Sequence, residues 1–238
     1  GVNERWGLPM KVKVLGSLIN DGKTINMKNF GIPWKNEVEK SAPIVAVLAT
    51  CMDSGKTSLI CKLADYFHDK DLTIAGAKLT GVAFMQDPYK MKDAGISTVM
   101  DFVDAGLPST CGTPGDAIGA ACGVITEINK TNPDLILAEF GDGIIGEYNV
   151  ASILTHPSFK KHIVMTVVAA NDLMAAWGAK QKMKELGLAI DVFTGPVVNS
   201  QVGVDYVENN FGIPAESNQY AIPKTIAILE EKMKGVGV

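Results

Sequence analysis

The chain has 238 residues, of which 47% are hydrophobic and 20% charged, and its formal net charge is −4. This length is enough for one substantial core. Its acidic balance gives no general attraction to nucleic acid or to an anionic membrane, and no run of about 20 apolar residues predicts a membrane-spanning helix. We therefore expect a soluble, cytoplasmic protein whose primary partner is neither nucleic acid nor a membrane.

Residues 1–42 form the first predicted unit, an N-terminal strand and arm that could be the remainder of a longer N-terminal region. Its alternation of polar and apolar residues over Lys11 to Gly16 predicts a short strand. The polar, glycine-containing sequence that follows, up to Pro43, predicts a loosely structured arm. Residues 43–238 form the second predicted unit, a nucleotide-binding domain.

A phosphate-binding loop is predicted between the apolar strand Ile44 to Ala49 and an amphipathic helix that begins at Thr57 and runs to Lys70. Gly55 lets the backbone N–H groups approach an anion at the positive end of the new helix. Lys56 then supplies an ammonium group for the outer phosphates, and the Thr57 hydroxyl can bind Mg²⁺. The predicted nucleotide-binding residues are Thr50, Met52, Ser54, Gly55, Lys56, Thr57 and Ser58, and Asp53 in the same loop is a catalytic candidate beside Lys56.

Strands and helices continue to alternate through the rest of the chain. Each predicted strand is a continuous apolar run, as expected for parallel strands covered by helices on both faces. This pattern predicts an α/β fold with a doubly wound, mostly parallel sheet. The further elements are predicted at Leu72 to Lys78, Pro114 to Lys130, Leu135 to Glu139, His162 to Ala169, Leu173 to Leu186 and Ile190 to Val198.

Polar residues follow several of these strands, where ligands bind in open α/β sheets. Glu139 ends an apolar strand and could hold Mg²⁺ opposite the phosphate loop, although a loop cap is its ordinary role. Lys78 could join Lys56 in binding a substrate carboxylate or a transferring phosphoryl group, or it could be a solvated surface lysine. Asp142 and Glu147 are weaker candidates.

The segment from Gly81 to Asp116 is unusually long for a connection and contains several aspartates, Asp87 among them. It predicts an active-site loop or lid on the substrate side of the site. The alternative is a helix over Tyr89 to Val103 whose aspartates form its solvated face.

The order of these motifs resembles the dethiobiotin synthetase group of P-loop enzymes, which includes cobyrinic acid synthetases and the nucleotide-binding protein of molybdenum cofactor assembly. The resemblance covers about Ile44 to Ala215. It implies ATP and Mg²⁺ as cofactors, a small carboxylate-type substrate, and a homodimer with the substrate at a twofold interface. The positions that carry it are Ala49, Thr50, Asp53, Gly55 to Thr57, Lys78, Glu139 with Gly141 and Gly143, Asn199 as the adenine-contacting residue, and Gly212 to Pro214.

The chain also resembles a second, poorly characterised group that shares the sequences at Ala77 to Gly81 and Asp104 to Gly112. Some of its members act in N-acyl transfer to an amino acid, which would make the bound anion a phosphate of acetyl-coenzyme A. Three functions follow from the sequence: an ATP-dependent ligase that activates a carboxylate by phosphoryl transfer, a nucleotide-switched assembly factor, and an N-acyltransferase. Because Asn199 is followed by Ser200 and Gln201 rather than by the usual guanine-selecting sequence, ATP is favoured over GTP.

The four cysteines, Cys51, Cys61, Cys111 and Cys122, contain no CxxC pair and show no zinc-type spacing with the three histidines. This pattern favours free thiols in a reducing compartment over a metal site.

Overall fold

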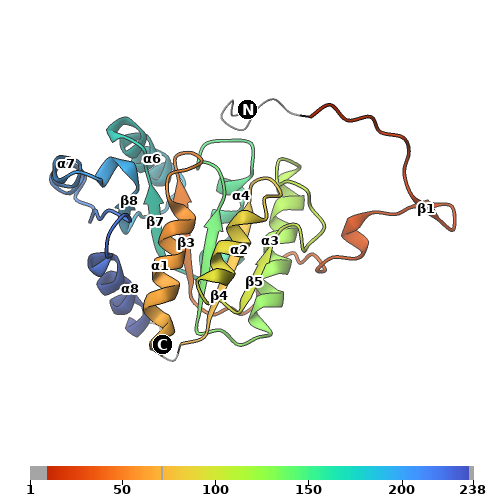
Figure 1. Ribbon diagram of the computed structural model, residues 1–238, viewed down its shortest axis with the longest axis horizontal. Coiled ribbons are helices and arrows are strands. Elements are labelled where there is room, and N and C mark those ends of the chain that lie inside the picture. Colours follow the sequence, from red (N-terminus) through yellow and green to blue (C-terminus); the bar gives the residue numbers. More distant parts are fainter. Residues whose placement is uncertain (1–9, 71, 236–238) are drawn as a thin grey trace.

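The centre of the fold is a six-stranded parallel sheet with the strand order β5-β4-β6-β3-β7-β8. The computed structural model describes residues 10–70 and 72–235 of the chain. Figure 1 shows the sheet between two layers of helices. The strands are β3 (Ile44–Ala49), β4 (Ile74–Thr80), β5 (Thr98–Asp101), β6 (Leu135–Phe140), β7 (Ile163–Ala169) and β8 (Val192–Thr194).

Helices cover both faces of this sheet. One hydrophobic core lies between the sheet and the side that carries α3 and α6, and the other lies beneath α1 and α8. The predicted doubly wound α/β fold is therefore confirmed. The helices are α1 (Lys56–His68), α2 (Gln86–Asp93), α3 (Pro114–Asn129), α4 (Val150–Leu154), α5 (Pro157–Lys160), α6 (Leu173–Glu185), α7 (Gln201–Phe211) and α8 (Pro223–Gly235), with the 3₁₀ turns η2 (Met27–Asn29) and η3 (Pro196–Val198).

The central strands follow from their apolar sequences. All residues of β3, β4 and β6 are buried, as expected of parallel strands covered on both faces. Strand β6 lies between β3 and β4, and the registers place Glu139 beside both Val47 of β3 and Lys78 of β4. The sheet therefore brings Lys78 and Glu139, which are 61 positions apart in the sequence, to one place.

The segment between Gly81 and Asp116 is more regular than a lid. The alternative of a helix over Tyr89 to Val103 is correct only at its beginning, because α2 ends at Asp93 and Gly95, with φ of 88°, turns the chain. Residues 98–101 then form β5 on the edge of the sheet. Part of this segment is therefore scaffold, and its first half alone reaches the pocket described below.

The last strand is shorter than the sequence predicts. The apolar run from Ile190 to Val198 is a strand only over β8, because Gly195 has φ of 88° and Pro196 lacks a backbone N–H for strand pairing. The 3₁₀ turn η3 follows at once.

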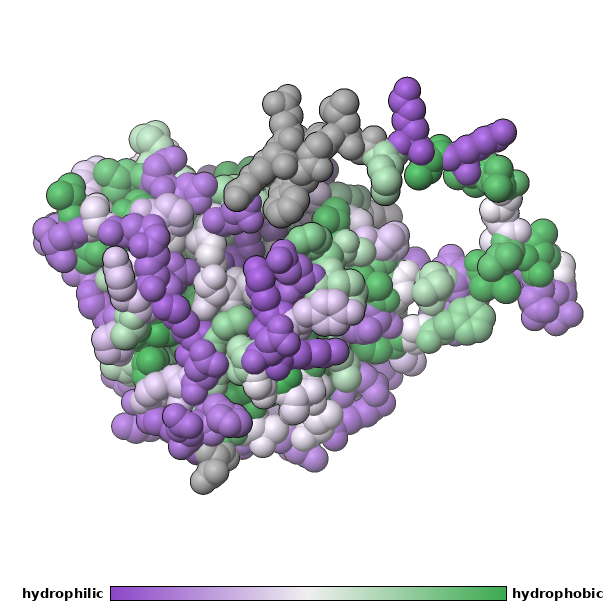
Figure 2. All heavy atoms as spheres, in the orientation of Figure 1, coloured by the Kyte–Doolittle hydropathy of each residue, from purple (hydrophilic) through white to green (hydrophobic). Residues whose placement is uncertain are grey.

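The strand expected at Lys11 to Gly16 is absent, and the described arm instead carries a hairpin of β1 (Ile19–Asn20) and β2 (Lys23–Thr24). A strand needs a neighbour for its backbone hydrogen bonds, and residues 11–16 lie beside no other strand among the described residues. Figure 2 shows the arm standing clear of the body of the molecule. Within the described part of the chain, no helix has both the length and the apolar character needed to cross a membrane.

Candidate functional site

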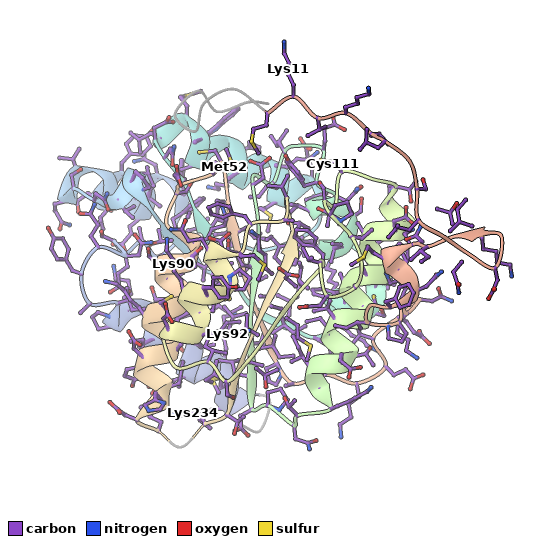
Figure 3. The ribbon with its side chains drawn as sticks, turned by 45° about the vertical axis from the view of Figure 1, so that its right-hand side comes forward. Lys11, Met52, Lys90, Lys92, Cys111 and Lys234 are labelled. Atoms are coloured by element: carbon purple, nitrogen blue, oxygen red, sulfur yellow. The ribbon has the colours of Figure 1, made fainter. Side chains whose placement is uncertain are left out.

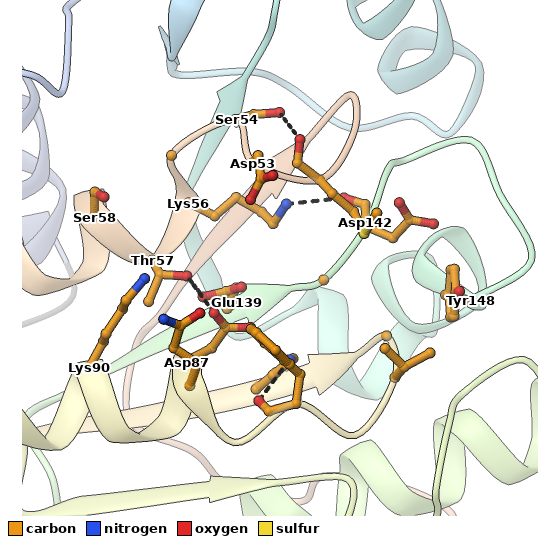
Figure 4. Close-up of a pocket in the computed structure, with 18 residues that line it drawn as sticks. Asp53, Ser54, Lys56, Thr57, Ser58, Asp87, Lys90, Glu139, Asp142 and Tyr148 are labelled. Atoms are coloured by element: carbon orange, nitrogen blue, oxygen red, sulfur yellow. Dashed lines mark hydrogen bonds and ion pairs between the residues drawn. The ribbon is translucent and has the colours of Figure 1, made fainter. Parts of the chain in front are cut away.

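A pocket of about 510 Å³ lies at the carboxyl ends of β3, β4 and β6. Its walls come from three stretches of the chain, within residues 52–58, 78–90 and 139–148. Figure 4 shows the polar side chains of these stretches converging around Lys56 and Glu139, with Tyr148 at one side. We call this hollow the phosphate-loop pocket.

The loop between β3 and α1 presents the N-terminus of α1 to this pocket. Gly55 precedes the helix with φ of 93°, a conformation that favours glycine, and no side chain caps the first N–H groups of α1. The Asn218 side chain donates a hydrogen bond of 2.7 Å to the Gly55 carbonyl oxygen, and a Cβ atom at Gly55 would collide with Asn218. The loop is thus held in a shape that leaves backbone donors for an anion.

Lys56 is almost fully buried beside this loop. Its ammonium group donates to the carbonyl oxygens of Cys51 and Asp142, at 3.2 and 3.3 Å. Burial lowers the pKa of Lys56, and the negative charge of Glu139 opposes that shift. The ammonium group is therefore positioned inside the pocket by backbone oxygens rather than by a tight ion pair.

Thr57 lies between two carboxylates. Its hydroxyl donates to Glu139 Oε2 at 2.8 Å and lies 3.3 Å from Asp87 Oδ1. Burial raises the pKa of Glu139, the nearby charge of Asp87 raises it further, and Lys56 opposes the shift. A hydroxyl oxygen and two carboxylates are oxygen ligands of the kind that Mg²⁺ prefers, so these residues fit a magnesium ion.

Lys78, which is buried, and Asp87, which is half-buried, form an ion pair at the floor of the pocket. The ammonium group lies 2.7 Å from Asp87 Oδ2, and the Lys78 side chain is 4% exposed. It also donates to the Phe84 carbonyl oxygen at 3.4 Å. Lys78 is not the last residue of its strand, because β4 extends to Thr80. Its side chain nevertheless lines the pocket and is not that of a solvated surface lysine.

Most of the predicted site residues line this pocket, but two do not. Thr50 lies outside the lining, with its hydroxyl oxygen buried and without a hydrogen-bond partner. Asn199 is exposed, lies outside the lining, and accepts a hydrogen bond of 2.8 Å from the Ser217 hydroxyl. The predicted residues that line the pocket are Met52, Asp53, Ser54, Gly55, Lys56, Thr57, Ser58, Lys78 and Glu139.

Asp87 and Asn218 are site residues that the sequence does not single out. Asp87 is one of several aspartates in its segment, and only the fold places it beside Thr57 and Lys78. Asn218 contacts the loop from 163 positions away, in a polar stretch with no motif. Among the described residues, no group of three or more His, Cys, Asp and Glu side chains forms a metal site, so bound Mg²⁺ would need oxygen ligands beyond the protein carboxylates.

The comparisons with known proteins show a likeness in fold. No protein-family model matches it, and a search of curated proteins finds no match. The signal recognition particle receptor FtsY of Elizabethkingia anophelis is 10% identical, with a TM-score of 0.53 over 79% of this chain and 62% of that chain. Its complex with GDP is 14% identical, with a TM-score of 0.54 over 74% of this chain and 56% of that one.

The cell division protein FtsY of Thermotoga maritima is a further structural neighbour, 16% identical with a TM-score of 0.52. The alignment covers 80% of this chain and 66% of that chain, so this chain spans less than two thirds of the length of these neighbours. The chain has the fold of the P-loop NTPases. At these identities the likeness extends to the fold and not to activity or partners.

Proposed function

We propose that the phosphate-loop pocket binds a nucleoside triphosphate together with Mg²⁺. The observation that carries the proposal is the hydrogen bond of 2.8 Å between the Thr57 hydroxyl and the Glu139 carboxylate, at the N-terminus of α1 and beside the Lys56 ammonium group. The backbone N–H groups of residues 52–57, which include Asp53 and Ser54, would bind the β and γ phosphates. No other part of the described chain combines a helix N-terminus, a buried lysine and two carboxylates.

Each group then has a role set by its charge. Lys56 would bind the outer phosphates. Thr57, Glu139 and Asp87 would supply oxygen ligands for Mg²⁺, and the Thr57 hydroxyl could still donate its hydrogen bond to Glu139. The ion, when bound, neutralises negative charge on the β and γ phosphates. The Asn218 amide keeps the loop in its binding shape, and is a positioning residue.

We propose further that the protein activates a small carboxylate by phosphoryl transfer. The γ-phosphoryl group would leave the β-phosphate oxygen and bond to a carboxylate oxygen of the substrate, giving an acyl phosphate and a nucleoside diphosphate. Lys78 supports this proposal, because a buried ammonium group on the pocket floor suits a carboxylate or a phosphoryl group in transfer. The ligase chemistry itself rests only on the resemblance of the sequence motifs to those of the dethiobiotin synthetase group.

We propose ATP as the nucleotide, and this choice rests only on the sequence that follows Asn199. Asn199, the candidate for contact with adenine, lies outside the pocket lining, so its role would require the base to extend beyond the pocket toward Ser217. One structural neighbour, FtsY of Elizabethkingia anophelis, is a complex with GDP, so GTP is the direct competitor in any binding test.

A nucleotide-switched assembly factor is the second candidate function. Asp87 at the start of α2 contacts both Thr57 and Lys78, so binding at the loop would change the contacts of α2 and of the β5 edge that follows it. In this function the hydrolysed nucleotide changes a binding surface and no second substrate is phosphorylated.

Thermal shift with ATP, GTP and acetyl-coenzyme A, each with and without Mg²⁺, tests these proposals. Binding of the nucleotide to the folded state raises the melting temperature in proportion to the logarithm of its concentration above the dissociation constant. The proposal predicts a Mg²⁺-dependent shift with ATP. A shift with acetyl-coenzyme A that is indifferent to Mg²⁺, with none for either nucleotide, would instead support the N-acyltransferase.

A further inference from the structure

The N-terminal arm, residues 10–30, exposes a row of large apolar side chains. Eight of them are between 66% and 89% exposed, and Figure 2 shows apolar side chains along the part of the arm that stands away from the body. Isolated apolar residues are common on protein surfaces, but several large ones exposed together on one short segment are a sign of a binding surface. The eight are Met10, Val12, Val14, Leu15, Leu18, Ile19, Met27 and Phe30.

The sequence of this arm is that of a strand without a neighbour. Lysines alternate with apolar residues from Met10 to Val14, the period of a strand with one buried face. Asp21 and Gly22, with φ of 49° and 74°, form a tight turn between β1 and β2, and the Ile25 N–H donates to the Leu18 carbonyl oxygen at 2.9 Å. Pairing then stops, so residues 10–17 retain unpaired backbone groups within the described structure.

The root of the arm is fixed beside an open edge of the sheet. The Ile32 N–H donates to the Asp104 carbonyl oxygen at 2.7 Å, and the Trp34 ring nitrogen donates to the Ala105 carbonyl oxygen at 2.8 Å. Both acceptors lie in the turn that follows β5. This strand is an edge strand, and its first three residues, 98–100, are half-buried. Figure 1 shows the arm leaving the body on this side, beyond α3 and β5.

The charge of the arm favours binding to the acidic body of a second copy of the chain over binding to the basic arm of that copy. The arm carries four lysines and one aspartate, whereas the whole chain has a net charge of −4, so the rest of the chain is distinctly acidic. Asp93 and Asp104, which are exposed, lie on either side of β5 in the sequence. In Figure 3 the Lys11 side chain points away from its own molecule.

We propose that residues 10–15 of one copy add as a strand to the β5 edge of a second copy, and that the exchange is reciprocal. An unprotected edge strand accepts an extended segment through main-chain hydrogen bonds, and alternate side chains give specificity. Val12 and Val14 would be buried in the contact, while Lys11 and Lys13 would face acidic residues. A twofold pair of such contacts closes, so the product is a dimer.

Sedimentation equilibrium of the full chain over a range of concentrations tests this dimer. The double variant Val12→Asp and Val14→Asp should weaken dimerisation at least about tenfold. Val202→Asp is the matched control, because Val202 is 76% exposed on α7 and distant in the sequence from the arm and from β5. Hydrogen exchange of residues 98–101 supplies the second readout, with protection in the wild-type dimer and faster exchange in the arm variant.

Each alternative result overturns the proposal. A wild-type chain that remains monomeric at every concentration would show that no such dimer forms. A dimer of unchanged affinity in the Val12→Asp and Val14→Asp variant would show that the arm does not hold the dimer together. Protection of β5 in a monomer would show that the arm folds back onto its own sheet. Co-sedimentation of a monomer with vesicles of anionic lipid would assign the basic, apolar arm to a membrane surface. All of these measurements are made without nucleotide and are independent of the proposed function.

Discussion

Replacement of Glu139 by glutamine separates the proposed metal site from a purely structural role. Glutamine has nearly the same shape and keeps an oxygen that can accept the Thr57 hydrogen bond, but it carries no charge. The hydrogen bond weakens by about 1 kcal/mol when its acceptor becomes neutral, and the loss of attraction to Lys56 adds to this cost. The substitution also removes the desolvation cost of burying a charged carboxylate that is only 2% exposed, and this gain opposes the loss.

These opposing effects leave the stability of Glu139→Gln within about 1 kcal/mol of wild type, or about 4 °C in melting temperature for a chain of this size. Metal binding should change far more. Residues that only orient metal ligands typically contribute 10- to 100-fold to affinity, so loss of a direct ligand should weaken Mg²⁺-dependent ATP binding by about tenfold or more.

Calorimetric titration of ATP with and without Mg²⁺, combined with thermal unfolding, measures both quantities, and Glu185→Gln on the exposed surface of α6 is the matched control. Because the pKa of Glu139 is raised above its ordinary 4.5, the wild-type carboxyl becomes protonated, and Mg²⁺ binding is lost, at a higher pH than for an exposed glutamate. Between the pKa of Glu139 in the unfolded chain and its raised pKa in the folded protein, the folded state binds more protons, so the free energy of unfolding falls as pH rises. Glu139→Gln removes this dependence. A collapse in melting temperature with normal Mg²⁺-dependent binding per folded molecule would show that Glu139 is structural.

Three further substitutions test the groups around it. Asp87→Asn should weaken Mg²⁺-dependent ATP binding by several-fold in calorimetry while ATP binding without Mg²⁺ stays constant or improves, and an unchanged Mg²⁺ dependence would remove Asp87 from the metal site. Lys78→Met should reduce phosphorylation in a panel of small carboxylates far more than it reduces ATP affinity, whereas an equal loss of both would make Lys78 a nucleotide ligand. Asn218→Ala should lower the free energy of unfolding by about 1–3 kcal/mol, because the Gly55 carbonyl oxygen loses its hydrogen-bond donor, and it should also weaken ATP binding. Full ATP affinity in the destabilised variant would mean that the loop keeps its shape without Asn218.

The sequence predicts the strands that are buried on both faces and the loop between β3 and α1, because continuous apolar runs and the Gly55-Lys56-Thr57 motif are local signals. The sequence does not predict β5, a strand of four residues that forms by pairing with β4 at the edge of the sheet. It wrongly predicts a strand at residues 11–16, where the strand pattern has no neighbouring strand. Helix or strand in such short segments depends on distant partners that periodicity does not reveal.

Site residues divide in the same way. Lys56, Thr57 and Glu139 are predictable because each belongs to a motif or ends an apolar run. Asp87 and Asn218 are not, because their roles arise from contacts across 30 and 163 positions. The resemblance alone indicates Asn199 as an adenine contact, and the Asn199 side chain accepts a hydrogen bond from Ser217 outside the pocket lining.

Calorimetric titration of wild-type protein and Lys56→Ala with ATP and Mg²⁺ tests the central claim most directly, since Lys56 is the one buried ammonium group at the N-terminus of α1. Lys184→Ala, an exposed lysine on α6, is the matched control. The proposed site predicts saturable, Mg²⁺-dependent binding by wild-type protein and by Lys184→Ala, and no measurable binding by a folded Lys56→Ala. Equal affinity in all three proteins, or binding by none of them, would contradict it.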